Sequence, residues 1–300
     1  MRKIIIGSRG SALALAQSEE VARRLESRFP ELKTEIRVIH TKGDQILDRP
    51  IAQIGSKGVF TQEIEQALRH GEIDLAVHSM KDMPSTLPEG LMFAGSPTPS
   101  SPYDVLVLNH GYRCWQELPQ GARIGTGSLR RAYQLKKMRP DVQIVGLRGN
   151  VGTRLNKMKS EKLDAIVLAH AGLLRLHWEE KWTLQLLSDE EMIPACAQGI
   201  LALEVKEDTD LLPYLEAITD KEATLRMQVE RMFLNTIGGD CHVPIGAHVI
   251  FAEDHWLLHA LYGKEDGSAL CVRHEKIPVG SMAGIVQLAK EMKAEVEGHG

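Results

Sequence analysis

Positively charged side chains recur in short turns of small residues, most of them directly after an apolar run typical of a strand. The cations are Arg9, Lys57, Lys81, Arg130, Arg131, Arg148, Arg154 and Arg175. Small residues at a helix N-terminus expose backbone N–H groups to an anion, and a neighbouring cation adds charge. One such cation alone would be an ordinary surface charge. Eight cations in six turns favour a site for a small molecule with several carboxylates or phosphates.

Two further residues in turns have the chemistry for catalysis. Asp82 directly follows Lys81, and its carboxylate could act in acid–base catalysis, or could be a helix N-cap or a structural ion pair. Cys241 follows Gly238-Gly239-Asp240, so its thiol could reach outward from a loop, or could be a small packed hydrophobe. The residue types alone leave both alternatives open.

Alternating strand and helix patterns position these turns. Ile4–Ile6 reads as a buried strand, Ser11 can cap the following helix, and strands and helices then alternate to about residue 200. Such a βαβ rhythm predicts mostly parallel sheets. The Pro- and Ser-rich segment 96–102 and the region near Pro194 read as crossings between domains. After about residue 218 a long helix, three strands with an Asp266-Gly267 hairpin turn, and a closing helix predict a small α+β domain.

Composition excludes several classes of protein. With 300 residues, 43% hydrophobic and 25% charged, the chain is an ordinary globular one of two or three domains. A net charge of −4 and 5% aromatic residues argue against nucleic-acid binding. The four cysteines lack C-x-x-C spacing, which favours reduced thiols in a cytoplasmic protein. The apolar run after the N-terminus is too short for a signal peptide, and no run is long enough to span a membrane.

Other catalytic motifs do not fit this sequence. Arg130 stands where a dinucleotide fingerprint that begins at Gly125-x-Gly127 would need its third glycine. The sequence has neither a phosphate-binding G-x-x-x-x-G-K-[ST] loop nor a G-x-S-x-G elbow. The twelve histidines include no H-E-x-x-H pair, so we expect no metal site.

The turns together resemble one family, porphobilinogen deaminase, also called hydroxymethylbilane synthase. The matching segments run in order along nearly the whole chain: Gly7–Ala14, Thr41–Asp44, Gly55–Phe60, Ala76–Pro84, Gly125–Arg131, Leu147–Leu155, Ala171–Leu176 and Cys241–Gly246. The resemblance implies two α/β domains like type II periplasmic binding proteins and a small α+β C-terminal domain. The implied domain boundaries are 1–97 plus about 198–216, 98–197, and 217–300.

The resemblance also implies a reaction. Four porphobilinogen molecules are joined head to tail, each losing ammonia, to give the linear tetrapyrrole hydroxymethylbilane in porphyrin biosynthesis. In the implied reaction, the growing pyrrole chain is attached to a dipyrromethane cofactor, which a thioether holds to Cys241. Asp82 is the implied catalytic residue, which assists ammonia loss and stabilises the cationic azafulvene. No nucleic acid or membrane partner is implied, and we expect a monomer.

The remaining site residues are implied by matching position, with cations for the acetate and propionate groups. Implied cofactor-binding residues besides Cys241 are Ser79, Lys81, Thr126, Ser128, Arg130, Arg131 and Arg154. Implied substrate-binding residues are Arg9, Ser11, Lys57, Arg148, Arg175 and Gln198. The chain departs from the family pattern at Gln53, Ala197 and Asp240, where lysine, glycine and glycine are common.

A competing interpretation from another class is a two-lobed binding protein for a polycarboxylate small molecule. It would explain the cationic turns, but it would explain neither the acid at Asp82 nor a third domain with a loop thiol. It also predicts an export signal. A transcriptional regulator with such an effector domain would need a DNA-reading module, which the sequence does not contain.

Overall fold

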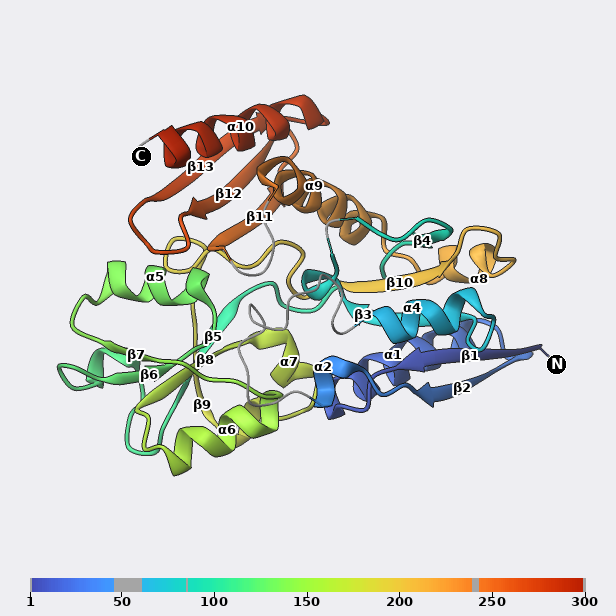
Figure 1. Cartoon of the computed structure of the whole chain (residues 1–300), viewed down its shortest axis with the longest axis horizontal. Helices are drawn as coiled ribbons and strands as arrows, with labels where there is room; N and C mark the ends of the chain where they lie inside the picture. The colour runs from blue at the N-terminus through green and yellow to red at the C-terminus, as the bar shows by residue number, and fades with distance from the viewer. Residues whose placement is uncertain (1, 46–60, 85, 239–242, 299–300) are drawn as a thin grey trace. The chain divides into compact units, whose positions relative to one another are not determined.

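The computed structural model describes residues 2–45, 61–84, 86–238 and 243–298. These residues form two compact units, Met1–Ser100 with Ile200–Leu225, and Ser101–Gly199 with Arg226–Gly300. The chain thus leaves unit 1 near residue 100 and re-enters it at Ile200 (Figure 1). The finer boundary at 217, which would separate a third domain, stays a prediction.

Unit 1 is built on a five-stranded sheet of order β2-β1-β3-β10-β4. Its strands are β1 (Arg2–Ser8), β2 (Leu32–Val38), β3 (Leu75–Ser79), β4 (Leu91–Phe93) and β10 (Leu201–Lys206). β1 pairs in parallel with β2 and β3, whereas β10 runs antiparallel between β3 and β4. Strand β10 comes from beyond the second sheet in sequence, so it ties the returning chain into unit 1.

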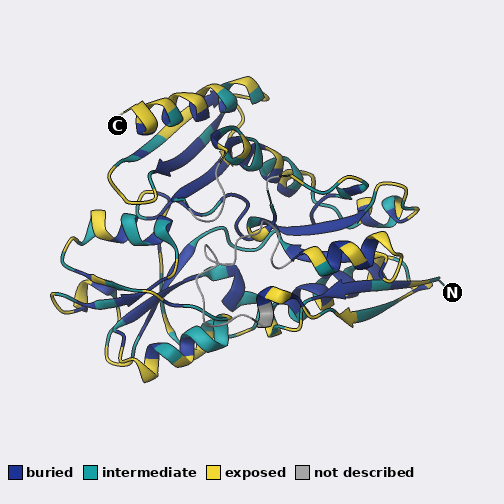
Figure 2. Ribbon diagram, in the orientation of Figure 1, coloured by how far each residue is buried: buried dark blue, intermediate teal, exposed yellow. Residues whose placement is uncertain are grey.

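Helices cover this sheet as the apolar spacing requires. The helices of unit 1 are α1 (Ala12–Arg28), α2 (Lys42–Gln45), α4 (Gln62–Arg69), the 3₁₀ turn η1 (Met80–Asp82) and α8 (Leu212–Glu216). Val21 and Leu25 of α1 pack with Ile4 and Ile6 of β1 in one core, and Ile64 and Leu68 of α4 belong to another. Figure 2 shows the buried strands and the exposed outer faces of the helices.

Unit 2 contains a second five-stranded sheet, of order β7-β6-β8-β5-β9. Its strands are β5 (Asp104–Leu108), β6 (Arg123–Gly125), β7 (Gln143–Val145), β8 (Ala165–Ala169) and β9 (Thr183–Leu186). Its helices are α5 (Leu129–Met138), α6 (Val151–Ser160), α7 (His170–Arg175), and the 3₁₀ turns η2 (Trp115–Glu117) and η3 (Glu179–Lys181). β6 pairs in parallel with β7 and β8, and β5 runs antiparallel between β8 and β9.

A three-stranded antiparallel sheet completes the C-terminal part of the chain. Its strands are β11 (Ile245–Phe251), β12 (His255–Gly263) and β13 (Leu270–Pro278), in that order. Two long helices accompany it in the sequence, α9 (Lys221–Ile237) before the sheet and α10 (Met282–Gly298) after it. Gly267 has a φ of +76° in the β12–β13 turn, where the sequence predicts a hairpin.

The two five-stranded sheets share one topology, in which a single strand runs against the other four. The predicted architecture, two α/β sheets followed by a small antiparallel sheet with helices, is confirmed. Four of the five strands in each sheet run in the same direction, as predicted. The sequence did not predict that β5 and β10 run in the opposite direction. In the described part of the chain, no helix is long and apolar enough to cross a membrane.

Candidate active site

In unit 1 the predicted site residues that the structure describes lie near the carboxyl ends of the adjacent parallel strands β1 and β3. Arg9 follows β1, and Ser11 caps α1, since its hydroxyl accepts from the Ala14 backbone N–H at 3.3 Å. Ser79 ends β3 and accepts a 2.8 Å hydrogen bond from the Gln17 side chain. Lys81 is half-buried in η1. The ends of parallel strands are where ligands bind in open α/β sheets.

Asp82 is the exposed last residue of η1. It is therefore not the N-cap that the sequence left open, because that position belongs to Ser79. Within the described residues, no hydrogen bond or ion pair involves the Asp82 carboxylate. Its neighbours Met80 and Met83 are buried, and the Met83 N–H donates to the Met80 carbonyl. The turn thus presents a carboxylate to solvent from a backbone anchored on both sides.

In unit 2 the predicted residues gather at the ends of β6, β7 and β8. Thr126 and Ser128 lie between β6 and α5, Arg148 and Arg154 between β7 and the first turns of α6, and Arg175 ends α7. Two glycines bring these turns together. A Cβ on Gly127 would lie 2.7 Å from the Leu147 carbonyl oxygen, and Gly149 adopts a φ of +113°. Both positions therefore require glycine, and Gly127 allows the Thr126–Ser128 turn to lie close to Leu147, which precedes Arg148.

Arg130 and Arg131 differ from the other cations because they point into the protein. Both are buried and share one carboxylate, that of Asp104. Arg130 Nη1 donates to Asp104 Oδ2 at 2.6 Å, and Arg131 Nη2 donates to Oδ1 at 2.7 Å. Burial alone would raise the pKa of Asp104, but the two guanidinium groups outweigh it and hold that pKa well below its ordinary value.

Sequence reasoning missed Asp104. β5 runs antiparallel, so its first residue lies beside the last residue of β8, at the same edge as the cationic turns. An acid that opens the buried run Val105–Leu108 was the available signal, because a buried carboxylate needs a partner. The two arginines predicted to bind the cofactor thus share a carboxylate of the protein itself.

The crossing segment near Pro194 is anchored to the same edge of unit 2. Gln198 is buried and donates to the Pro102 carbonyl at 2.7 Å and to Asp104 Oδ1 at 3.0 Å. Arg175 donates to the Gly199 carbonyl at 3.0 Å. Ala197 keeps a left-handed φ of +58°, and its N–H donates to Glu230 of α9 at 2.5 Å. Ala197 therefore adopts a left-handed conformation that glycine favours.

The donors at these edges fit a ligand with several carboxylates. Neither α5 nor α6 has an acidic residue in its first turn. No side chain caps α5 within the described structure, so its first N–H groups face the turn that carries Thr126 and Ser128. Half-buried Arg148, Arg154 and Arg175 add charge. Such a set suits the acetate and propionate groups of a dipyrromethane.

Two predicted site residues, Lys57 and Cys241, lie outside the described residues, as do Gln53 and Asp240. Within the described ranges, no group of three or more His, Cys, Asp or Glu side chains could hold a metal ion.

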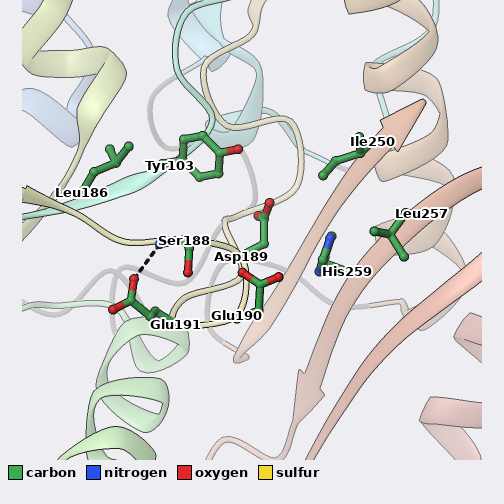
Figure 3. Close-up of a pocket in the computed structure, with 9 residues that line it drawn as sticks. All are labelled: Tyr103, Leu186, Ser188, Asp189, Glu190, Glu191, Ile250, Leu257 and His259. Carbon is green, nitrogen blue, oxygen red and sulfur yellow. Dashed lines mark hydrogen bonds between the residues drawn. The ribbon is translucent and has the colours of Figure 1, made fainter. Parts of the chain in front are cut away.

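Figure 3 shows a pocket in unit 2 whose lining includes Tyr103, Asp189, Glu190, Ile250 and His259. None of its lining residues is a predicted site residue. Its carboxylates would repel an anionic ligand, so this pocket is not the site that the cationic turns predict.

Comparisons with known proteins point to one family. The family model "Porphobilinogen deaminase, dipyromethane cofactor binding domain" matches residues 4–213, and "Porphobilinogen deaminase, C-terminal domain" matches residues 224–296. Porphobilinogen deaminase of Clostridium novyi (strain NT) is 45% identical over 297 residues, 98% of this chain and 97% of the relative. The enzyme of Clostridioides difficile (strain 630) is 43% identical over 298 residues, 99% of each chain.

A solved structure with a similar arrangement is substrate binding domain 2 of Lactococcus lactis GlnP. It is 13% identical and covers 77% of this chain and 92% of its own, with a TM-score of 0.45. A likeness of that size says nothing about activity or ligand. Full-length relatives and two family models that together span most of the sequence do establish kinship. The chain belongs to the porphobilinogen deaminase (hydroxymethylbilane synthase) family, the tetrapyrrole-forming enzymes with a dipyrromethane cofactor domain.

Proposed function

We propose that Asp82 is the acid–base residue with which this chain joins four porphobilinogen molecules into hydroxymethylbilane. The observation that carries the proposal is the exposed Asp82 carboxylate, which ends η1 beside Lys81 and makes no hydrogen bond or ion pair with another described residue. As ammonia leaves a porphobilinogen, positive charge develops on the substrate. A fixed carboxylate stabilises that charge and can accept or return a proton.

We assign the cations at the two sheet edges to the carboxylates of substrate and cofactor. In unit 1 these are Arg9 and Lys81, supported by the hydroxyls of Ser11 and Ser79. In unit 2 they are Arg148, Arg154 and Arg175, with Thr126 and Ser128. Arginine binds a carboxylate with two parallel hydrogen bonds, which fixes the ring that carries it. Lys57 completes the proposed substrate contacts.

Arg130, Arg131 and Gln198 have a different proposed role. All three donate to Asp104, and Arg130 and Gln198 also donate to backbone carbonyls of Ile193 and Pro102. We infer that these three residues keep the ends of β5 and β8 in place. Their N–H groups that are not used in those hydrogen bonds would bind a cofactor carboxylate. In this proposal Arg130 and Arg131 both stabilise the ends of β5 and β8 and bind the ligand.

We assign the covalent attachment of the cofactor to Cys241. When bound, the dipyrromethane supplies the pyrrole to which the first substrate molecule is joined. The other three cysteines are free thiols, and two of them, Cys196 and Cys271, are buried. Burial raises the pKa of Cys196 far above its ordinary value and that of Cys271 to about 11. Both are therefore poor nucleophiles, which supports a loop thiol as the attachment point.

We further propose that the enzyme works as a monomer in the cytoplasm. Free thiols at Cys114, Cys196 and Cys271 fit a reducing compartment. Every residue assigned above belongs to one chain, so the proposed mechanism needs no second copy.

The stoichiometry of turnover tests the proposed reaction. Purified enzyme given porphobilinogen should release one ammonia per porphobilinogen consumed, with one hydroxymethylbilane for every four. Ammonia, residual porphobilinogen and product are measured in the same samples. Tight binding of porphobilinogen without ammonia release would instead support the polycarboxylate-binding protein.

A further inference from the structure

A buried polar network of His78, Glu204 and Glu65 lies next to the catalytic turn, and the proposed mechanism does not use it. His78 of β3 donates from Nε2 to Glu204 Oε2 of β10 at 2.9 Å. The two side chains are 6% and 0% exposed. Glu65 of α4 is also buried on this side of the sheet. Oε1 of Glu204 and Oε1 of Glu65 each lack a hydrogen-bond partner within the described structure.

The stability of the fold does not explain why His78, Glu204 and Glu65 are buried here. The apolar core under α4 includes Ile64, next to Glu65 in the sequence, and Ala76, two residues before His78. Burial raises the pKa of Glu65, and the nearby charge of Glu204 adds to that rise. Taking a charged or polar group out of water is costly, and apolar residues of similar volume are often as stable as a buried pair or more so. A buried polar network in which some atoms lack hydrogen-bond partners destabilises the folded state, so its presence calls for a functional explanation.

The network sits where the catalytic turn leaves the sheet. Ser79 lies opposite Leu201 in the β3–β10 ladder, and the Met80 N–H donates to the Ile200 carbonyl at 3.0 Å. His78 and Ser79 are neighbours in β3, so their side chains point to opposite faces of the sheet. One face carries the His78–Glu204 hydrogen bond, and the other carries the Gln17–Ser79 hydrogen bond at 2.8 Å. Side-chain hydrogen bonds thus hold the end of β3 on both faces of the sheet, immediately before η1.

Asp82 depends on this anchoring because no hydrogen bond or ion pair from the described residues orients its side chain. Catalytic groups need placement to within about 0.5 Å. We propose that Glu204 is a positioning residue, which acts through His78 to hold the end of β3 against β10 and so places the Asp82 carboxylate. The inference rests on the catalytic role proposed for Asp82.

The decisive experiment compares three variants with the parent enzyme, each loaded with cofactor as judged by intact mass. Glu204→Gln keeps the shape and removes the charge that accepts from His78. The double variant His78→Leu/Glu204→Leu replaces the pair by apolar residues of similar volume. Asp189→Asn is the matched control, because Asp189 accepts from His248 at the same 2.9 Å, also between buried side chains, but in unit 2.

We expect Glu204→Gln and the double variant to lower kcat by roughly 10–100-fold with KM changed less than about twofold, because a small misplacement of a catalytic group costs about that much. The double variant should melt at or above the temperature of Glu204→Gln. Asp189→Asn should keep kcat within about twofold of the parent enzyme. Hydrogen exchange supplies a readout other than activity. The Met80 and Met83 amides should exchange about 10-fold faster in Glu204→Gln than in Asp189→Asn, because the strand end opens more often.

The outcomes separate the two proposals. A stable double variant with the kcat of the parent enzyme would show that the pair only fills space, and the inference would be overturned. Asp82→Asn is measured alongside. If it is impaired while the Glu204 variants are normal, only the positioning role fails. If Asp82→Asn itself turns over normally, the proposed catalytic role fails, and the positioning role with it.

Discussion

Asp82→Asn is expected to lower turnover of porphobilinogen by roughly 10²–10⁴-fold while the melting temperature stays unchanged. Asparagine keeps the size and shape of the side chain and removes the charge that stabilises the developing cation. Asp82 is exposed and makes no hydrogen bond or ion pair with the described residues, so the fold has little to lose. The loss should therefore fall on kcat and not on stability.

Porphobilinogen consumption and thermal melting, measured on the same preparations, check this prediction. Asp82→Glu should retain more activity than Asp82→Asn, although the longer side chain misplaces the carboxylate. Glu89→Gln is a suitable control, because Glu89 is another exposed acid of unit 1, and it should turn over normally. A well-folded Asp82→Asn protein with near-normal turnover would end the catalytic assignment.

The second large effect concerns stability. Asp104→Ala should lower the free energy of unfolding by about 3–5 kcal/mol, because it leaves two buried guanidinium groups without their shared carboxylate. Arg130 and Arg131 are 4% and 5% exposed, so water cannot replace that partner. The matched control is Asp208→Ala, which breaks an exposed ion pair with Lys206 and should cost at most about 1 kcal/mol.

The ion pairs of Asp104 with Arg130 and Arg131 also make the free energy of unfolding depend on pH. The folded-state pKa of Asp104 lies below its ordinary 3.8. Its contribution is therefore fully present above pH 3.8 and is lost only as the pH falls through the lower, folded-state value. Denaturant unfolding at pH 7 and near pH 3 measures this. The stability difference between the parent enzyme and Asp104→Ala should be large at pH 7 and should persist at pH 3 in reduced form. An Asp104→Ala protein as stable as the Asp208→Ala control at pH 7 would contradict the buried-pair account.

Local sequence patterns predicted most of the framework. Helices α5 (Leu129–Met138) and α6 (Val151–Ser160) each follow a strand, as the alternation expected up to about residue 200 requires. Cations after apolar runs do lie at strand ends, because strand, turn and helix are contiguous in sequence. Ser11 caps α1 as its position before the apolar helix suggested.

What the sequence could not predict depends on residues far apart along the chain. Asp104 and Arg131 are 27 positions apart, and His78 and Glu204 are 126 apart. Periodicity gives no information about such pairs, because it describes one element at a time. The reversed direction of β10 is equally hidden, since it follows from the return of the chain into unit 1. For this reason the sequence predicted a cofactor-binding role for Arg130 and Arg131 without their ion pairs to the buried Asp104.

The central claim is that this chain builds a tetrapyrrole on a primer covalently attached to Cys241, and intact mass spectrometry with peptide mapping tests it most directly. Active enzyme should be heavier than the unmodified 300-residue chain by two linked pyrrole units. Mapping should place the added mass on Cys241 and leave Cys114, Cys196 and Cys271 unmodified. Cys241→Ser should lack the adduct, because a hydroxyl is a far poorer nucleophile near neutral pH. Active enzyme whose Cys241 carries no added mass would contradict the account.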